Sequence, residues 1–144
     1  MSKLTLKQAQ TIIEGALAKA REMKINPLGV IVLDASGHVV ASAREDGASM
    51  FRLDVGMGKA WGAVAMGDSS RSLATRAKDN PNFFVTLAAT AGGKFLPQTG
   101  AALIKDASGA ILGAAGASGG TGDEDEACCI AGIKKAGLTS VPAA

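Results

Sequence analysis

Residues 28–43 read LGVIVL-DASG-HVVASA, two runs rich in β-branched residues on either side of the turn Asp34–Gly37. Such runs around a turn closed by glycine predict a β-hairpin. The same Asp-Ala-Ser-Gly turn returns at Asp106–Gly109, within the similar stretch 101–117, and predicts a second hairpin. Since no short β-α-β alternation links these runs, they favour a mainly antiparallel sheet over a doubly wound one.

A helix is predicted before the first hairpin. Apolar residues recur at helical spacing from Leu6 to Met23, directly after a capping box formed by Thr5 and Gln8. The pair Asn26-Pro27 ends this helix, because a residue that precedes proline disfavours the helical conformation.

Three helices are predicted between the hairpins, and one after them. The three are 50–66 with Ser49 as its cap, 71–78 after Asp68 or Ser69, and one from Asn80-Pro81 through Leu87 that Gly92-Gly93 ends. The last helix starts at 121–123 and reaches Ala136, with Gly137 just beyond its end. The order is therefore α-β-β-α-α-α-β-β-α, and no linker divides it. We predict one α+β domain over 1–144, with the sheet flanked by helices.

Composition excludes several classes of protein. The chain has 144 residues, 47% hydrophobic and 19% charged, which excludes disorder. Aromatic residues are 3% and tyrosine is absent, so stacking platforms for single-stranded nucleic acid are not expected. A net charge of +2 is too small for a nucleic-acid footprint. We expect a small-molecule ligand, no nucleic acid and no membrane.

The compartment expected is the cytoplasm. The opening residues lack the apolar region of a signal peptide, and no apolar run reaches the roughly 18 residues of a membrane span. The two cysteines, Cys128 and Cys129, are adjacent, and such a pair on a helix does not meet disulfide geometry without strain.

A glycine-rich segment, 113–122, joins the last predicted strand to the last helix, where phosphate-binding loops also lie. The four acidic residues Asp123–Glu126 follow it and would repel a nucleotide. Two interpretations remain: a loop packed against another backbone with acidic capping, or a ligand pocket formed by the loop's amides.

Several charged side chains are candidates for ligand contacts. Arg44 lies in a charged loop that is either solvated or positions Arg44 to bind a ligand carboxylate. Lys59 lies in the apolar run 55–66 and either reaches solvent or acts as a substrate clamp or an acid/base group. The basic span 52–78 and the acidic last helix suggest two surfaces that meet, within a chain or between chains.

The histidine and the cysteines each allow two interpretations. His38 follows the turn glycine and is either a surface residue or a metal or haem ligand. Cys128 and Cys129 lie in the first turns of the last helix, where a thiol pKa can fall, and are either core or reactive. With one histidine and no Cys-x-x-Cys, a zinc site and a Ser-His-Asp triad are not expected.

Together these segments resemble the GlcG/HbpS-like family, also called the haem-degrading domain family, which includes the C-terminal domain of the PduO proteins. The resemblance covers 4–137 and is carried by Leu4–Ala9, Val32–Gly37, Arg44–Ala48, Gly58–Ala60, Gly113–Gly119 and Asp125–Ala127. It implies an α/β sandwich like those of profilin and PAS domains, a higher oligomer, and haem as the ligand of some members. The sequence departs from the family at Thr99–Ala102, where Gly-Gly-x-Pro is frequent.

The resemblance also implies a set of pocket residues, and two functions follow from it. The ligand-binding candidates are Arg44, Asp46, Ser118, Gly119 and Glu126, and the catalytic candidates are Lys59 and Asp125. The first function is a homo-oligomeric small-ligand-binding protein, with haem as the suggested ligand and the helix 55–66 near the subunit contact. The alternative is an enzyme acting on a small organic acid or carbonyl compound, in which Arg44 holds the carboxylate while Lys59 and Asp125 exchange protons. A purely structural subunit would have no pocket.

Overall fold

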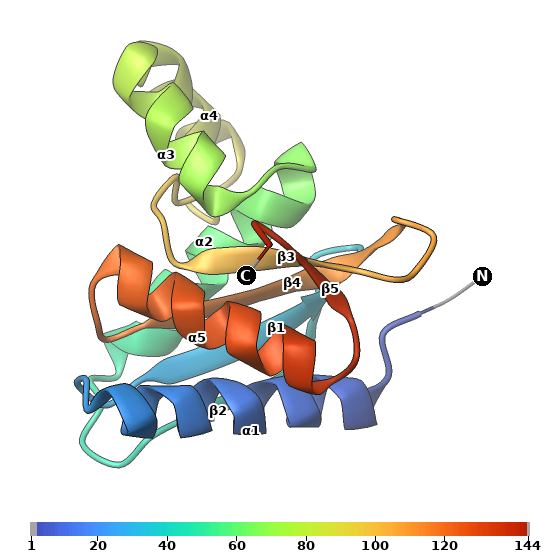
Figure 1. Cartoon of the computed structure of the whole chain (residues 1–144). Helices are drawn as coiled ribbons and strands as arrows, with labels where there is room; N and C mark the ends of the chain where they lie inside the picture. Colours follow the sequence, from blue (N-terminus) through green and yellow to red (C-terminus); the bar gives the residue numbers. More distant parts are fainter. Residues whose placement is uncertain (1–2, 144) are drawn as a thin grey trace.

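The two hairpins pair with each other through their inner strands and build one antiparallel sheet (Figure 1). The computed structural model describes residues 3–143, so the predicted limits Met1, Ser2 and Ala144 lie outside the described part. Within residues 3–143 the strands follow the order β2-β1-β4-β3-β5. They are β1 (Gly29–Asp34), β2 (Val39–Arg44), β3 (Ala101–Lys105), β4 (Ile111–Ser118) and β5 (Thr139–Val141).

The repeated turns form as the sequence predicts. The Asp34 carboxylate accepts hydrogen bonds from the backbone N–H groups of Ser36 (2.9 Å) and His38 (3.0 Å). Asp106 accepts the equivalent bonds from Ser108 and Ala110. An aspartate that binds its own following backbone in this way fixes each turn locally, before any tertiary contact is made.

Helices cover both faces of the sheet (Figure 1). α1 and α5 pack side by side on one face, over a core that includes Ile12, Ile104 and Ile133. α2 packs on the other face, over Leu33, Ala60 and Leu103. The helices are α1 (Leu6–Met23), α2 (Phe51–Met66), α3 (Ser70–Asp79), α4 (Pro81–Thr90) and α5 (Gly122–Lys135). The predicted α+β sandwich is confirmed.

Glycine permits the close approach of α2 to the sheet. A Cβ on Gly116 of β4 would lie 2.2 Å from the carbonyl oxygen of Gly56 of α2, so no larger residue fits without displacing backbone. The same device brings α1 against α5, where a Cβ on Gly132 would lie 2.1 Å from the Ile12 oxygen. These contacts place α2 near enough to β4 for its side chains to reach past the strand.

Two details differ from the sequence prediction. The N-cap of α2 is Met50 rather than Ser49, and the Ser49 hydroxyl instead accepts from the Phe51 N–H at 3.1 Å, because the chain enters the helix one residue later. The strand β5 was not predicted. It has three residues and pairs only with β3, so its sequence carries too little alternation to be recognised.

Candidate functional site

A row of three residues crosses one end of the sheet on the side that faces α2. In the register, Gly29 of β1 lies opposite Arg44 of β2 on one side and Ser118 of β4 on the other. A Cβ on Gly29 would lie 2.9 Å from Cβ of Arg52, so this face of the row is turned toward α2. Because cross-strand partners point to the same face of a sheet, Arg44 and Ser118 lie on the α2 side as well.

Two guanidinium groups therefore flank the bare backbone of Gly29. Arg52 donates to the Ser118 hydroxyl at 3.4 Å, and Arg44 donates to the Ala48 carbonyl at 2.6 Å. Within residues 3–143, neither guanidinium forms an ion pair with a carboxylate. The row is thus a local concentration of positive charge that is not neutralised by the chain. Arg52 was not among the predicted residues, although it lies in the basic span 52–78.

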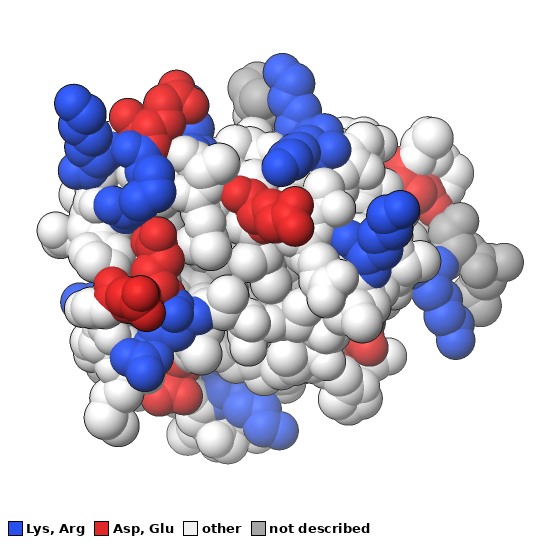
Figure 2. All heavy atoms as spheres, turned by 90° about the horizontal axis from the view of Figure 1, so that it is seen from below, with Lys and Arg blue, Asp and Glu red and all other residues white. Residues whose placement is uncertain are grey.

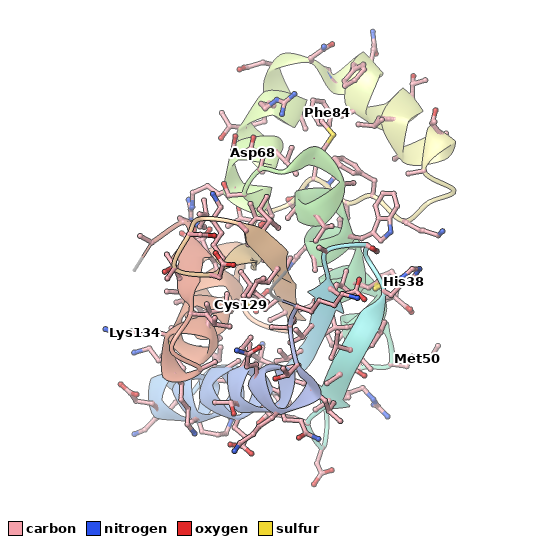
Figure 3. The ribbon with its side chains drawn as sticks, turned by 90° about the vertical axis from the view of Figure 1, so that its right-hand side faces the viewer. His38, Met50, Asp68, Phe84, Cys129 and Lys134 are labelled. Carbon is pink, nitrogen blue, oxygen red and sulfur yellow. The ribbon has the colours of Figure 1, made fainter. Side chains whose placement is uncertain are left out.

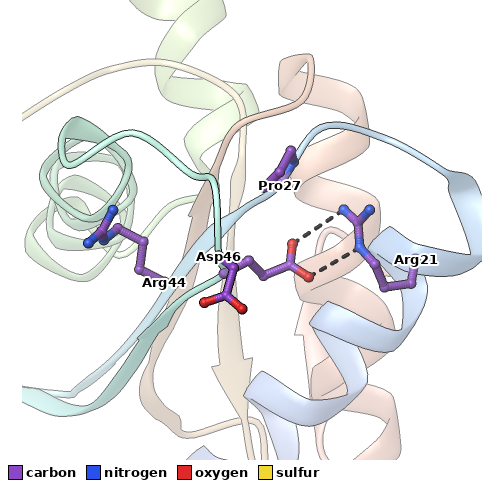
Figure 4. A pocket seen from close by; sticks show the side chains of 5 residues that line it. Arg21, Pro27, Arg44 and Asp46 are labelled. Carbon is purple, nitrogen blue, oxygen red and sulfur yellow. Dashed lines mark hydrogen bonds and ion pairs between the residues drawn. The ribbon is translucent and has the colours of Figure 1, made fainter.

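Arg44 and Asp46, two of the predicted ligand-binding residues, line the same hollow. The hollow has a volume of about 430 Å³ and is also lined by Arg21, Pro27 and Glu45. Figure 4 shows the Arg44 and Asp46 side chains pointing in different directions, with Arg44 turned toward α2 and away from Arg21. Arg21 pairs there with Glu45 at 3.1 Å, and Glu45 also accepts from the Leu28 N–H at 2.8 Å. This second pair fastens the loop after β2 to α1.

Lys59 and Asp125 meet, as predicted, although they come from helices on opposite faces of the sheet. Lys59 Nζ lies 3.1 Å from Asp125 Oδ2 and donates to the Ala117 carbonyl at 3.0 Å. The other oxygen, Asp125 Oδ1, accepts from the Gly120 N–H at 2.9 Å. The lysine passes beside Gly100, where a Cβ would lie 2.5 Å from Nζ. Glycine immediately before β3 therefore leaves the space through which Lys59 reaches α5.

This pair is buried and hydrogen-bonded on both sides. The side chains are 7% and 1% exposed for Lys59 and Asp125, respectively. Burial raises the pKa of the Asp125 carboxyl, and the charge of Lys59 and the Gly120 N–H oppose that rise only in part. The pair connects α2 and α5, which lie on opposite faces of the sheet, and Lys59 also bonds the backbone of β4 between them. It therefore links the three layers of the fold.

The loop 118–122 packs against neighbouring backbone. Gly119 has a φ of +142°, and a Cβ there would lie 2.4 Å from the Pro27 carbonyl oxygen. The Gly120 amide is engaged by Asp125, and Gly122 lies against Thr99. The first of the two interpretations of this segment, a closely packed loop with acidic capping, describes what the structure shows.

Glu126 is paired with Arg71, a residue that sequence analysis did not single out. Arg71 Nη2 lies 3.0 Å from Glu126 Oε1, and the same guanidinium also bonds Asp123. Both carboxylates raise the pKa of Arg71. The basic span and the acidic helix therefore meet within the chain, through Arg71 and through Lys59, as one of the two predicted arrangements requires.

The thiols and the histidine lie away from the cationic row. Cys128 and Cys129 are buried, and Figure 3 labels Cys129 in the interior. Burial raises the pKa of Cys128 to about 11 and that of Cys129 well above its usual value. Of the two interpretations of the cysteines, the core position agrees with the structure, because desolvation raises the pKa of both thiols. His38 is exposed in the turn at the opposite end of β1 from Gly29. Within residues 3–143, no group of three His, Cys, Asp or Glu side chains is placed to hold a metal ion.

The fold and the row of residues define an α+β sandwich with a cationic site at one end of its sheet. The chain belongs to the family of haem-degrading proteins like HbpS, whose family model matches residues 4–134. None of the helices in the described part of the chain has the length and apolar character to cross a membrane.

Solved structures share the fold. A complex of PduOC with haem is 22% identical, with a TM-score of 0.84 over 95% of this chain and 97% of that one. A double mutant of HbpS from Streptomyces reticuli is 27% identical, with a TM-score of 0.80 over 93% and 87%. Protein ORFY of Klebsiella pneumoniae is 22% identical, with a TM-score of 0.84 over 95% and 93%. Curated proteins gave no match.

Proposed function

We propose that this protein binds a small anionic ligand and that this ligand is haem. The binding site is the end of the sheet formed by Arg44, Gly29 and Ser118, with Arg52 above them. The observation that carries the proposal is the pair of guanidinium groups flanking Gly29, neither of which has a carboxylate partner among the described residues 3–143. Guanidinium binds carboxylate through two parallel hydrogen bonds, and a bare glycine lets a ligand approach the backbone. Haem presents two carboxylates and a large apolar ring, and the family and the haem complex of PduOC both support it.

Methionine, histidine and cysteine side chains of this chain could bind the haem iron. Met50 is 82% exposed and lies two residues before Arg52, so its thioether would be an accessible ligand for the iron at this end of the sheet. His38 and Met50 lie beyond opposite ends of β2 (Figure 3), while the thiols are buried. Haem iron is held by donors of these kinds, and bound haem would supply redox chemistry. A protomer thus offers Met50 as one donor next to the arginines, with Arg44 and Arg52 holding the propionates.

The alternative function was an enzyme for a small organic acid, in which Lys59 and Asp125 exchange protons with the substrate. A general acid or base must lie within hydrogen-bond reach of the proton that it transfers. Both groups are buried and already bonded to each other and to backbone, which supports a structural role instead. Arg44 would bind a carboxylate under either function. The binding function leaves the contacts of Lys59 and Asp125 unchanged, whereas the enzyme would have to break them.

A hemin titration tests the proposal. We expect a saturable Soret change at 1:1 stoichiometry, a loss of affinity of about tenfold or more in Arg44→Leu and in Arg52→Leu, and a shifted band in Met50→Leu. Lys7→Leu, which removes an exposed charge on α1, is the matched control and keeps full affinity. Unchanged affinity in both arginine variants would place the site elsewhere. Small carboxylates measured as competitors distinguish a general anion site from a haem site.

A cytoplasmic location and self-association complete the proposal. Both cysteines are free thiols in the core, which supports a reducing compartment. On the face that carries α1, acidic and basic side chains are interspersed (Figure 2). This face therefore lacks the uniformly positive surface that would attract a nucleic-acid backbone or an anionic membrane.

A further inference from the structure

The chain covers the outer side of β3 with its own groups. The strand β5 pairs there with the stretch Leu103–Lys105. At the start of β3 the buried hydroxyl of Ser70 takes the place of a strand, because it accepts from the Ala101 N–H at 2.9 Å and donates to the Ala101 carbonyl at 3.0 Å. The backbone of β3 is therefore paired on this side without another molecule.

The outer side of β2 has no such cover. Glu45 donates its N–H to the Leu28 carbonyl at 2.9 Å, so these two residues form a hydrogen-bonded pair. Because hydrogen-bonded pairs alternate along an antiparallel ladder, Ala43 bonds to β1, whereas the backbone groups of Ser42 and Arg44 point away from β1. Within the described residues 3–143, no second strand pairs with β2 on that side.

The face of β2 that looks toward α2 is also exposed. Val39 and Ser42 lie opposite Leu33 and Ile31, which belong to the core under α2. Cross-strand partners share a face of the sheet, so Val39 and Ser42 lie on this face as well. Both are nevertheless exposed, Val39 by 52%, because α2 packs mainly over β1 and β4. The strand β2 is thus open along one edge and one face.

The geometry of an open edge specifies what can pair with it. An edge strand presents a row of N–H and C=O groups that is a template for another strand, and proteins commonly protect such edges with charges, prolines or bulges. β2 reads VVASAR, with no proline and no charge before Arg44, and its bulge lies near its start, opposite Val32 and Leu33. Only an extended backbone offers donors and acceptors at the matching spacing.

The charge at one end of β2 specifies the partner further. Arg44 is the last residue of the strand, and neither its guanidinium nor that of Arg52 has a carboxylate partner among residues 3–143. The strand contains no acidic residue, so a second copy of β2 would leave both guanidinium groups without a counter-charge. A segment with a carboxylate at this end would supply one.

We propose that the outer side of β2 is a docking site for an extended segment of another polypeptide, which carries an acidic residue beside Arg44 and adds a strand to the sheet. The backbone of this segment bonds to Ser42 and Arg44, and its alternate side chains cover Val39 on the face toward α2. The inference goes beyond the proposed ligand site, although the two share the Arg44 guanidinium.

A synthetic peptide without hemin tests the proposal. The peptide has about eight residues, with blocked termini, aspartate at each end, and alternating valine and threonine between them. We expect it to shift the amide NMR signals of Ser42 and Arg44 and, at saturation, to slow their hydrogen exchange at least about tenfold. The Ala43 amide, already bonded to β1, changes little. The same peptide with lysine in place of aspartate is expected to bind at least about threefold more weakly.

Two proline variants test the role of the backbone. Ser42→Pro removes an outward N–H and leaves the bonds to β1 in place, since proline is tolerated on an edge strand. We expect this variant to bind the peptide at least about tenfold more weakly. Ala107→Pro is the matched control, because it places a proline in the exposed turn after β3, at a position where turns favour it. It binds the peptide like the wild type, and circular dichroism verifies both folds.

Several results would overturn the proposal. These are unshifted Ser42 and Arg44 signals at about 1 mM peptide, unchanged binding in Ser42→Pro, or unchanged binding of a peptide methylated on every backbone nitrogen. Hydrogen-exchange protection of these amides that grows with protein concentration, without peptide, would also overturn it, because the occupant would then be a second copy. Hemin affinity in Ser42→Pro stays at the wild-type value, since both guanidinium groups remain, so failure of the docking site and failure of the ligand site are distinguishable.

Discussion

Replacing Lys59 by methionine tests whether its contact with Asp125 stabilises the fold. Methionine keeps the apolar stem of the side chain but leaves Asp125 without its cation, in a position where the carboxylate side chain is 1% exposed. Removing one member of a buried ion pair costs about 3–5 kcal/mol, whereas an exposed pair is worth less than about 1 kcal/mol. For a domain of this size, a loss of about 4 kcal/mol lowers Tm by roughly 10 °C.

The destabilisation is expected to grow with pH. Burial already raises the pKa of Asp125 above its unfolded value, and Lys59 opposes that rise, so Lys59→Met raises the pKa further. A raised carboxyl pKa gives stability that is complete below the unfolded pKa and is lost as the pH rises through the folded pKa. In Lys59→Met the free energy of unfolding therefore keeps falling up to a higher pH than in the wild type. The slope of this fall is at most about 1.4 kcal/mol per pH unit.

Urea and thermal unfolding followed by circular dichroism from about pH 4 to pH 8 measure both effects. The difference between wild type and Lys59→Met should be small at the acidic end and largest at the alkaline end. The double variant Lys59→Met/Asp125→Asn is the control, because it has no carboxyl at this position and its difference from Asp125→Asn should vary little with pH. A difference below about 1 kcal/mol throughout would refute the argument that the buried pair links the layers.

Three further predictions follow from single contacts. Gly116→Ala is expected to destabilise the fold by about 3 kcal/mol or more, measured by urea unfolding, because its Cβ would lie 2.2 Å from the Gly56 oxygen; wild-type stability would contradict the close approach of α2. Arg71→Met is expected to lower the free energy of unfolding by about 1–3 kcal/mol in the same assay, because the buried Glu126 loses its partner. Arg76→Met is the control and should lower it by less, because its partner Asp68 is more exposed. Cys128 and Cys129 are expected to react with a thiol reagent at pH 8 only as fast as the chain opens, because burial raises their pKa; rapid labelling of folded protein would refute this.

The sequence by itself determined the local structure. Both turns are fixed by Asp34 and Asp106, whose carboxylates bond backbone only a few residues ahead, and α1 begins at a capping box that is complete within four residues. Such interactions need no distant partner, so they can be recognised from the residues alone. The pairing of Lys59 with Asp125 was also expected, because the family resemblance put both residues in one pocket and their opposite charges would satisfy each other there.

Tertiary structure alone decided which segments meet. The order of the sheet joins β1 to β4, and this register puts Arg44, Gly29 and Ser118 in one row and brings Arg52 over it. The fold also brings Glu126 against Arg71, a contact that no motif in the sequence indicated. The strand β5 forms because the edge of β3 presents backbone groups for pairing. The three residues of β5 carry no pattern that would predict this pairing. Strand order and contacts between helices depend on which apolar faces bury one another, and that free energy is shared across the whole chain instead of being held in any single motif.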